Sequence, residues 1–379
     1  MIRFVFSIFI LLGAFSCSKK EQASLPIRID LEKCINEFDS LNISVIASDL
    51  KTVKLETSEE CLLGRIIQVE YYNNEIFVLD ELSNLYVFSE KGKYNRKIEV
   101  IGRGPAELSQ INQFICVNDT IILFDSKIGI LKLYNFNGQF INKTLKHRYS
   151  TSMLYHNGKI LFYFPLEFNF FLPDVQHRFF MMDIDGSALN RFVKILPRQR
   201  PKTFRAFLNS ARLKQCNDDF FLFWQGGNTI YSFDWDSCLT FANINLGKFE
   251  VKNEWLDNLA ELQKNRNTYS SINNFFVGDD YILIQYSHLN NSNRLFWFDI
   301  KKKKGFNLAD KSRKFGFFDD LRKSGIAIFP QFMKKEYFIE VFDKSKVDKL
   351  VNDKPVSVPT IFREQSIEDN PILRITILK

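Results

Sequence analysis

The chain has 379 residues, of which 45% are hydrophobic, 25% charged and 15% aromatic, and lysine plus arginine exceed aspartate plus glutamate by 51 to 44. This hydrophobic fraction excludes a disordered chain, and a net charge of +7 among mixed charges gives no reason to expect a nucleic-acid partner. Most aromatic residues are phenylalanine, with 40 Phe against 13 Tyr and 4 Trp. Because aromatic side chains fit the pleated surface of a strand, the composition predicts an all-β protein.

The N-terminus predicts export and lipid anchoring. A positive start at Arg3 precedes a run from Phe4 to Phe15 that is almost wholly apolar. This run has the length of a signal-peptide core and is far shorter than the ~20 residues that span a bilayer. The sequence AFSC, which ends at Cys17, resembles the lipobox of bacterial lipoproteins. The resemblance implies cleavage before Cys17 and acyl chains at its sulfur and new N-terminus, a combination that gives stable anchoring.

The expected organisation has three parts: a lipoprotein signal peptide over 1–16, a lipid-anchor tether and lead-in over 17–42, and a single domain over 43–379. The tether begins with the polar sequence SKKEQAS after the cysteine. An ordinary secretory signal with a chance cysteine is the alternative. We expect a protein of the cell envelope, anchored at the outer membrane on its periplasmic or its surface face. No later stretch reaches the ~18 apolar residues of a transmembrane helix.

Five cysteines follow Cys17, and they bear on disulfides and metals. They are Cys34, Cys61, Cys116, Cys216 and Cys238. An odd number cannot all pair within the chain, and their spacings are not those of a zinc site. Two possibilities stay open: a disulfide between Cys216 and Cys238, or unpaired cysteines in strands.

A repeated pattern organises the rest of the chain: a turn, a short apolar strand and a second, aromatic-rich strand. The first copy is NNEIFVLD (73–80) followed by NLYVFSEKGKY (84–94), and the second begins 45 residues later. Further copies begin near residues 156, 217, 278 and 334. Repeats of ~40–50 residues with this content are typical of β-propeller blades. The sequence predicts six blades, with seven possible if 187–215 contains another.

Two further features complete the expected architecture. The segments 43–57 and 370–379 have strand patterns and are expected to complete the last blade, which would remove an exposed sheet edge. One insertion breaks the β pattern near 253–266, where apolar residues have helical spacing after Asn253, a possible N-cap. This insertion predicts one short helix, and a long loop is the alternative.

From about Ile43 to Lys379 the chain resembles the six-bladed β-propeller lipoproteins that are abundant in some Gram-negative bacteria. Three segments carry the resemblance: KLETSEECLLGRI (54–66), VIGRGPAELSQI (100–111) and FREQSIEDNPILRITILK (362–379). The chain departs from the family pattern at Ala106, where a glycine is common. The resemblance implies a secreted, lipid-anchored propeller in a largely uncharacterised family, often without known catalytic activity.

The connector around Arg103 and Glu107 is the first candidate binding site. It begins like a dinucleotide fingerprint, but Pro105 has no N–H to offer a phosphate and no helix follows. A rigid link between blades is therefore expected at this position. Arg103 could hold a carboxylate or a sugar hydroxyl beside the face of the disc, with Glu107 near it. A purely structural pair between Arg103 and Glu107 is the alternative.

The second candidate site is a basic segment. Residues 187–216 contain no acidic residue but many lysines and arginines. Within the segment, the candidate ligand-binding residues are Arg198, Arg200, Lys202 and Arg205. Such a patch could bind an anionic polymer, for example an acidic glycan or a lipid headgroup, with salt-sensitive affinity. A solvated loop between blades is the alternative.

The sequence offers little for catalysis, and we expect no cofactor, no metal and no catalytic residue. The chain has 4 histidines, none at metal-like spacing, and no G-x-S-x-G nucleophile elbow. Asp80 and Asp125 end equivalent strands and are expected to cap turns. Whether the protein is an enzyme stays open, with a non-enzyme favoured.

The leading functional hypothesis is a non-catalytic binding module for an extracellular ligand, such as a glycan or a partner in nutrient capture. One alternative is a metal-dependent propeller hydrolase or lyase, which predicts acids, amides or histidines converging at the axis. Another is a structural or assembly protein that binds other envelope proteins, which predicts a broad apolar surface. A glycan binder predicts exposed tyrosine or tryptophan.

Overall fold

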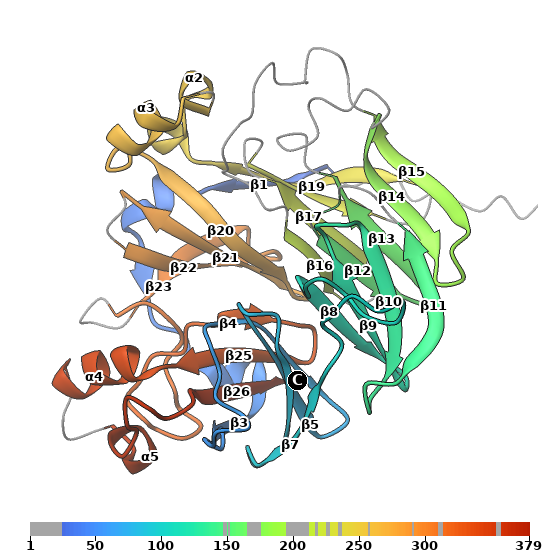
Figure 1. Ribbon diagram of the computed structural model, residues 1–379. Coiled ribbons are helices and arrows are strands. Elements are labelled where there is room, and N and C mark those ends of the chain that lie inside the picture. Colours follow the sequence, from blue (N-terminus) through green and yellow to red (C-terminus); the bar gives the residue numbers. More distant parts are fainter. Residues whose placement is uncertain are drawn as a thin grey trace, which may run out of the picture.

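The computed structural model describes residues 25–146, 150, 152–164, 176–194, 212–216, 219–224, 228–233, 237–256, 258–289, 292–309, 314–353 and 358–379. These residues form six sheets of four or five strands, arranged around a common axis (Figure 1). The protein is a six-bladed β-propeller, as the repeats predicted.

Blades 1 to 3 each consist of four consecutive antiparallel strands, which follow one another from the axis outwards. Blade 1 contains β4 (Ile66–Tyr72), β5 (Glu75–Asp80), β6 (Leu85–Ser89) and β7 (Tyr94–Ile98). Blade 2 contains β8 (Gln113–Val117), β9 (Thr120–Asp125), β10 (Ile130–Asn135) and β11 (Phe140–Lys146). Blade 3 contains β12 (Ser152–His156), β13 (Lys159–Tyr163), β14 (His177–Asp183) and β15 (Ala188–Lys194). The predicted strand pairs are therefore the two middle strands of each blade.

Blades 4 and 5 each gain a fifth, outermost strand from the N-terminal region. Blade 4 contains β16 (Arg212–Cys216), β17 (Asp219–Trp224), β18 (Thr229–Phe233), β19 (Cys238–Asn245) and β1 (Ile27–Asp30). Blade 5 contains β20 (Ser270–Val277), β21 (Tyr281–His288), β22 (Ser292–Asp299), β23 (Lys304–Leu308) and β2 (Phe38–Asp39). Both added strands run parallel to their neighbours. Residues of the expected lead-in thus cover two outer sheet edges, which would otherwise invite pairing with another chain.

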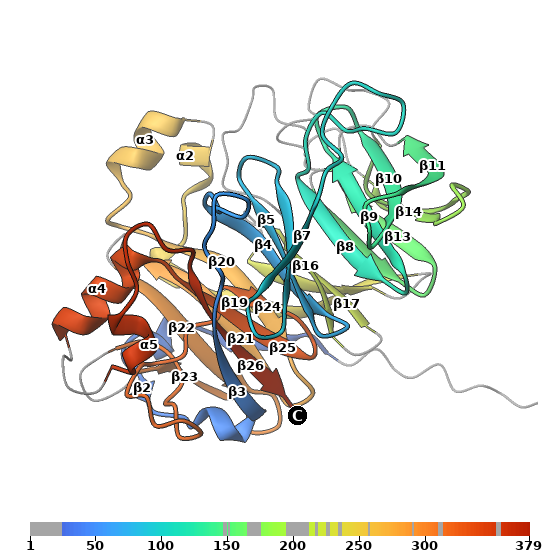
Figure 2. The same ribbon diagram turned by 60° about the horizontal axis from the view of Figure 1, so that its bottom comes forward.

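Blade 6 closes the ring with both ends of the propeller. It contains β24 (Phe332–Met333), β25 (Tyr337–Phe342), β26 (Ile372–Leu378) and β3 (Ala47–Lys54). The C-terminal strand β26 lies between β25 and the N-terminal strand β3. Figure 2 shows β3 and β26 side by side. The predicted closure by 43–57 and 370–379 is confirmed, because the two segments pair with each other.

Neighbouring blades are held together by apolar side chains from both faces of each sheet. In β5, Phe77 and Leu79 pack against blade 2, whereas Ile76 and Val78 pack against blade 6. Similar clusters join the other blades in sequence, so the ring has no open interface among the described residues. Since a strand exposes alternate residues on opposite faces, a strand buried on both faces must be apolar throughout. This requirement explains the short apolar runs in the sequence.

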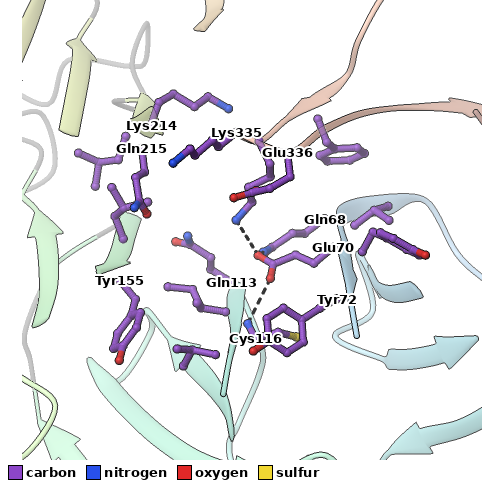
Figure 3. A pocket seen from close by; sticks show the side chains of 18 of the residues that line it. Gln68, Glu70, Tyr72, Gln113, Cys116, Tyr155, Lys214, Gln215, Lys335 and Glu336 are labelled. Atoms are coloured by element: carbon purple, nitrogen blue, oxygen red, sulfur yellow. Dashed lines mark hydrogen bonds and ion pairs between the residues drawn. The ribbon is translucent and has the colours of Figure 1, made fainter. Parts of the chain in front are cut away.

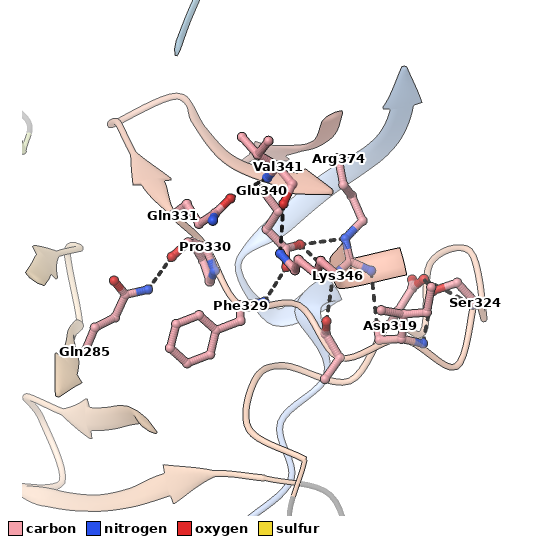
Figure 4. A network of polar contacts seen from close by, with 12 residues as sticks. Gln285, Asp319, Ser324, Phe329, Pro330, Gln331, Glu340, Val341, Lys346 and Arg374 are labelled. Carbon is pink, nitrogen blue, oxygen red and sulfur yellow. Dashed lines mark hydrogen bonds and ion pairs between the residues drawn. The ribbon is translucent and has the colours of Figure 1, made fainter. Parts of the chain in front are cut away.

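A buried ion pair lies inside the closing blade (Figure 4). Glu340 and Arg374 are directly opposite each other on β25 and β26, and each side chain is only 2% exposed. Nε of Arg374 donates to Oε2 of Glu340 at 2.6 Å, and its two Nη atoms donate to the carbonyls of Ile326 and Ala327 at 3.1 and 2.6 Å. Glu340 also accepts the N–H of Phe329 at 2.8 Å. The pair therefore ties the C-terminal strand to the segment that enters blade 6.

The helical insertions differ from the prediction of one helix capped by Asn253. The region 253–266 contains two short helices, α2 (Asn253–Leu256) and α3 (Leu259–Lys264). Asn258 caps α3, because its side chain accepts from the N–H groups of Ala260 and Glu261 at 3.1 and 3.2 Å.

The prediction of a single helical insertion is wrong. Within blade 6, the connection between β25 and β26 holds α4 (Lys344–Asp353) and α5 (Thr360–Arg363). Half of the residues of α4 are charged, and its few apolar residues pack in a small cluster with Phe342 and Ile372. Short 3₁₀ turns are η1 (Lys33–Asn36), η2 (Ile43–Val45) and η4 (Gly247–Phe249). Among the described residues, no helix is long and apolar enough to cross a membrane.

The region 187–215 was the possible seventh blade. Its ends belong to β15 of blade 3 and β16 of blade 4, and residues 195–211 lie outside the described residues. The thiols of Cys34, Cys61, Cys116 and Cys238 are free. Cys216 ends β16, the innermost strand of blade 4, and Cys238 begins β19, the fourth strand of the same blade. The two strands are three strand spacings apart, which is ~14 Å. A disulfide needs Cα atoms within ~7 Å, so the Cys216–Cys238 hypothesis is wrong.

Candidate functional site

The axis of the propeller contains a cavity of about 1400 Å³, which we call the central channel. It is lined by the innermost strands of the blades and by several of their hairpins, and most described side chains around it are polar (Figure 3). The lining amides are Gln68, Asn73, Asn74, Asn112, Gln113, Asn118, Asn157, Gln215, Asn274 and Gln331. The charged lining residues are Glu70, Lys214, Lys334, Lys335 and Glu336. The channel therefore offers many hydrogen-bond donors and acceptors over a volume that fits a small ligand.

Glutamine side chains satisfy the backbone at the inner edge of the blades. The amide of Gln68 donates to the carbonyl of Phe114 at 2.6 Å and accepts its N–H at 3.1 Å. Gln113 makes the same pair of bonds with Met153, at 2.7 and 2.9 Å. An inner strand has no neighbour on its axial side, and buried backbone groups need partners. Each glutamine thus replaces a missing strand and fixes one blade against the next.

Glu70 is the centre of a charged network in the channel wall (Figure 3). It is 4% exposed. One oxygen accepts Nε2 of Gln68 and Nζ of Lys334, both at 2.9 Å, and the other accepts the N–H of Cys116 at 3.1 Å. Glu70 lies on β4 and Lys334 follows β24, so this ion pair joins blade 1 to blade 6.

Burial and the Glu70 charge together set the ionisation of the neighbouring groups. Burial alone would lower the pKa of Lys334, but the attraction of Glu70 outweighs it and the pKa is raised. Burial first, and Glu70 second, hold the pKa values of the Cys116 thiol and the Tyr337 hydroxyl well above their usual values. Cys116 and Tyr337 are therefore neutral, and Cys116 is not a thiolate nucleophile.

The wall formed by blades 3, 4 and 6 carries the remaining charged groups. Lys214 on β16 donates from Nζ to the carbonyl of Met333 at 3.4 Å. Nε2 of Gln215 lies 2.6 Å from Nδ1 of His156, in the neighbouring blade. Lys335 and Glu336 are exposed in the turn that follows β24. Figure 3 shows the side chain of Lys335 extending toward Gln215.

This set of side chains suits binding. Amides and hydroxyls can donate to and accept from a polar ligand, and the lysines can neutralise a negative group. Among the residues that the structure describes, no group of three or more His, Cys, Asp or Glu side chains could hold a metal ion.

The predicted site residues Arg103 and Glu107 lie in the exposed connector between β7 and β8, and they do not line the channel. The carboxylate of Glu107 accepts the N–H of Gly104 at 2.6 Å, so it closes its own turn. Lys132, which is 5% exposed, donates from Nζ to the carbonyls of Pro105 and Glu107 at 2.7 and 2.6 Å. The connector is thus fastened to blade 2, as a rigid link requires.

Asp80 and Asp125 are fully buried and cap turns, as predicted. Asp125 accepts from the N–H groups of Lys127 and Ile128 in the following turn. It also accepts from the Ser109 hydroxyl at 2.6 Å and from the Ser109 and Gln110 N–H groups. Asp80 has the same role in blade 1, where it accepts from Leu82 and Asn84 in the following turn and from the N–H of Gly64 before β4 at 3.3 Å. Each aspartate therefore joins a turn to the connector that enters its blade.

The other predicted site residues, Cys17, Arg198, Arg200, Lys202 and Arg205, lie outside the described residues. Both ends of the same basic segment are described, and at its C-terminal end Lys214 lines the channel.

Sequence reasoning missed the channel residues because none of the strands that it identified is the innermost strand of a blade. The sequence does contain a signal for the innermost strands. The strand that precedes each apolar strand is more polar, as in IIQVEYY of β4 and RLKQC of β16.

Comparison with known proteins supports the fold. The model of a family described as "Domain of unknown function (DUF4934)" matches residues 26–376. A protein from Bacteroides fragilis NCTC 9343 that is described as exported has a similar structure, with a TM-score of 0.68 and 15% identity over 94% of this chain and 100% of its own. A duf4221 family member from Bacteroides vulgatus has a TM-score of 0.50 and 13% identity over 88% of this chain and 97% of its own.

No curated protein matches the chain. The family match covers nearly all of the described propeller, from β1 to β26. The chain therefore belongs to the DUF4934 family, a family of unknown function.

Proposed function

We propose that this protein is a lipid-anchored, non-catalytic binding module of the cell envelope, and that its ligand, a glycan, binds in the central channel. The observation that carries the proposal is the channel itself, a cavity of about 1400 Å³ lined by amides, tyrosines and lysines. Tyr72 and Tyr155 lie in its wall, each with its hydroxyl bonded to a hairpin backbone group. Sugar hydroxyls need both donors and acceptors, which this lining supplies.

A thermal-shift measurement tests binding. The mature protein, purified in detergent, is heated with neutral and acidic glycans, and with divalent metals in the presence and absence of a chelator. Ligand binding to the folded state raises the melting temperature by mass action. Asn274→Trp, which would fill the channel from β20, should abolish a glycan-induced rise. Lys91→Trp, on an exposed outer hairpin of blade 1, is the matched control. A rise with metal alone, reversed by chelator, would favour the hydrolase or lyase instead.

The anchor part of the proposal rests on the lipobox-like sequence that ends at Cys17. The first propeller strand begins at Ile27, so an extended tether of ten residues spans at most ~35 Å. The propeller would then sit close to the outer membrane, on its periplasmic or surface side. Metabolic labelling with an alkyne fatty acid should mark the wild type and Cys34→Ala, but not Cys17→Ala. Labelling of Cys17→Ala would overturn the anchor.

A second candidate function, docking of another envelope protein, is favoured by one surface. The turns and connectors at one end of blades 1 and 2 expose aliphatic side chains, namely Leu62, Leu82, Ile101 and Ile128 at 58%, 71%, 47% and 48%. Exposed apolar groups on successive loops are typical of protein contact sites. In-cell crosslinking from this face should be lost in Leu82→Asp/Ile128→Asp and kept in Leu239→Asp, a change at an equally exposed residue of β19. Unchanged crosslinking in the double variant would exclude this surface.

A further inference from the structure

The exposed aliphatic side chains at one end of blades 1 and 2 continue into blade 6. Leu62 precedes the first strand of blade 1, and Ile367, which is 83% exposed, precedes β26, the third strand of blade 6. Because successive strands of a blade are antiparallel, the first and the third strand begin at the same end of the ring. The resulting surface, which we call the aliphatic face, spans three neighbouring blades and consists of Leu62, Leu82, Ile101, Ile128 and Ile367.

One buried side chain fixes the aliphatic face at its blade 6 end. Asn370, which is 1% exposed, accepts the N–H of Leu63 at 2.8 Å. Its Nδ2 donates to the carbonyls of Glu56 and Cys61, both at 2.6 Å. The last loop of blade 6 is therefore joined to the loop that enters blade 1.

Further hydrogen bonds continue across blades 1 and 2. The N–H of Glu81 donates to the carbonyl of Arg65 at 2.9 Å. The hydroxyl of Ser83 donates to the carbonyl of Ile111, in the connector between the blades, at 3.3 Å. Asp125 joins the same connector to the next turn of blade 2. The loops thus form one preorganised surface, which lowers the entropy lost on binding.

The border of the aliphatic face is acidic where blade 6 meets blade 1. Segments 56–65 and 363–370 contain six acidic residues and two basic ones, in a chain whose net charge is +7. One of the two basic residues, Arg65, pairs with Glu81 at 2.8 Å. Four exposed carboxylates receive neither a hydrogen bond nor an ion pair from the described residues, namely Glu59, Glu60, Glu364 and Glu368. The described chain therefore leaves negative charge beside an apolar surface.

We propose that the aliphatic face binds a protein whose contact surface is apolar and bordered by lysine or arginine side chains. This inference rests on the docking function proposed above and names the partner by its chemistry. Protein interfaces combine an apolar centre with a polar rim, and complementary charges steer the encounter. An anionic lipid surface has the wrong charge for this face. A second copy that presented the same face would bring like charges together.

Site-specific photocrosslinking of the full-length protein in its own cells tests the contact. A benzophenone amino acid replaces Leu62, which lies between the aliphatic side chains and the glutamates. We expect one protein adduct, and mass spectrometry should place the crosslink in a partner segment where lysine or arginine flanks aliphatic residues. In isolated envelopes the yield should fall at least fivefold as salt rises from about 20 to about 500 mM, because salt screens the attraction.

Charge variants decide whether the carboxylates take part. The quadruple change of Glu59, Glu60, Glu364 and Glu368 to glutamine should lower the adduct yield at least tenfold and remove its salt dependence. All four side chains are exposed, so an unchanged melting temperature is expected and serves as the folding control. Asp119→Asn/Asp279→Asn removes two exposed carboxylates from hairpins at the other end of the ring, and should leave the yield unchanged.

The outcomes separate this inference from the docking function itself. An adduct that is lost in Leu82→Asp/Ile128→Asp but kept in the quadruple variant would overturn the charge inference and leave the docking surface. A partner segment without lysine or arginine would also overturn the inference. An adduct with lipid alone, or no adduct, would overturn both proposals.

Discussion

The buried pair of Glu340 and Arg374 allows a stability prediction to be worked out from individual atoms. Arg374→Met keeps most of the side-chain volume and removes the guanidinium. Glu340 then keeps one partner, the N–H of Phe329, while the carbonyls of Ile326 and Ala327 lose their donors. Removing one partner of a buried ion pair costs about 3–5 kcal/mol, because the other charge stays buried without compensation. We expect a loss of this size in the free energy of unfolding.

A double-mutant cycle separates the charge effect from the loss of packing. Glu340→Gln alone leaves Arg374 charged and buried, and should cost a similar amount. The double variant Glu340→Gln/Arg374→Met removes both charges of the pair, so its loss should be smaller than the sum of the single losses by about 2 kcal/mol or more. The control is Lys54→Met in the neighbouring strand β3, which removes the ion pair between Lys54 and Asp369. The side chains of Lys54 and Asp369 are 39% and 21% exposed, so the loss in the free energy of unfolding should be less than about 1 kcal/mol.

Urea unfolding followed by circular dichroism measures the stability of the wild type and of the four variants. Because the pair ties the C-terminal strand to the rest of blade 6, the midpoint should fall cooperatively for the whole propeller. A loss below about 1 kcal/mol for Arg374→Met, or strict additivity in the cycle, would refute the argument that an uncompensated charge dominates.

Two further predictions concern a turn and a titration. Asp125→Ala should lower the free energy of unfolding by about 3 kcal/mol, because this one carboxylate accepts hydrogen bonds from five donors. Asp119→Ala, at an exposed turn of the same blade, should change it by no more than about 0.5 kcal/mol. Equal losses of the two variants in urea unfolding would contradict the capping role of Asp125. Burial lowers the pKa of His288 to about 4. Between pH 6.5 and 4 the unfolded chain therefore binds more protons at this residue than the folded chain does. The free energy of unfolding should fall in this range by up to about 1.4 kcal/mol for each pH unit of acidification. His288→Gln should lose less stability than the wild type between pH 7 and 5, and an identical pH profile would show that His288 is not the titrating group.

The sequence alone determined the architecture, because each blade repeats a local pattern. A strand between two blades must be apolar on both faces, and the hairpin between strands needs residues that tolerate positive φ. Both requirements appear as short runs such as EIFVLD followed by a turn, so the copies could be counted directly. The closing role of 43–57 and 370–379 followed from their strand patterns and from their places before the first copy and after the last.

The tertiary structure decided where the polar residues meet. Glu70, Lys214 and Lys334 are far apart in the chain, and no local pattern shows that β4, β16 and β24 share an axis. The helices of blade 6 were missed because half of the residues of α4 are charged and its few apolar residues pack only in a small cluster. Strand formation depends on neighbours in sequence, whereas a channel depends on how the ring closes. This difference explains why the sequence indicated the blades and the structure was needed to find the candidate site.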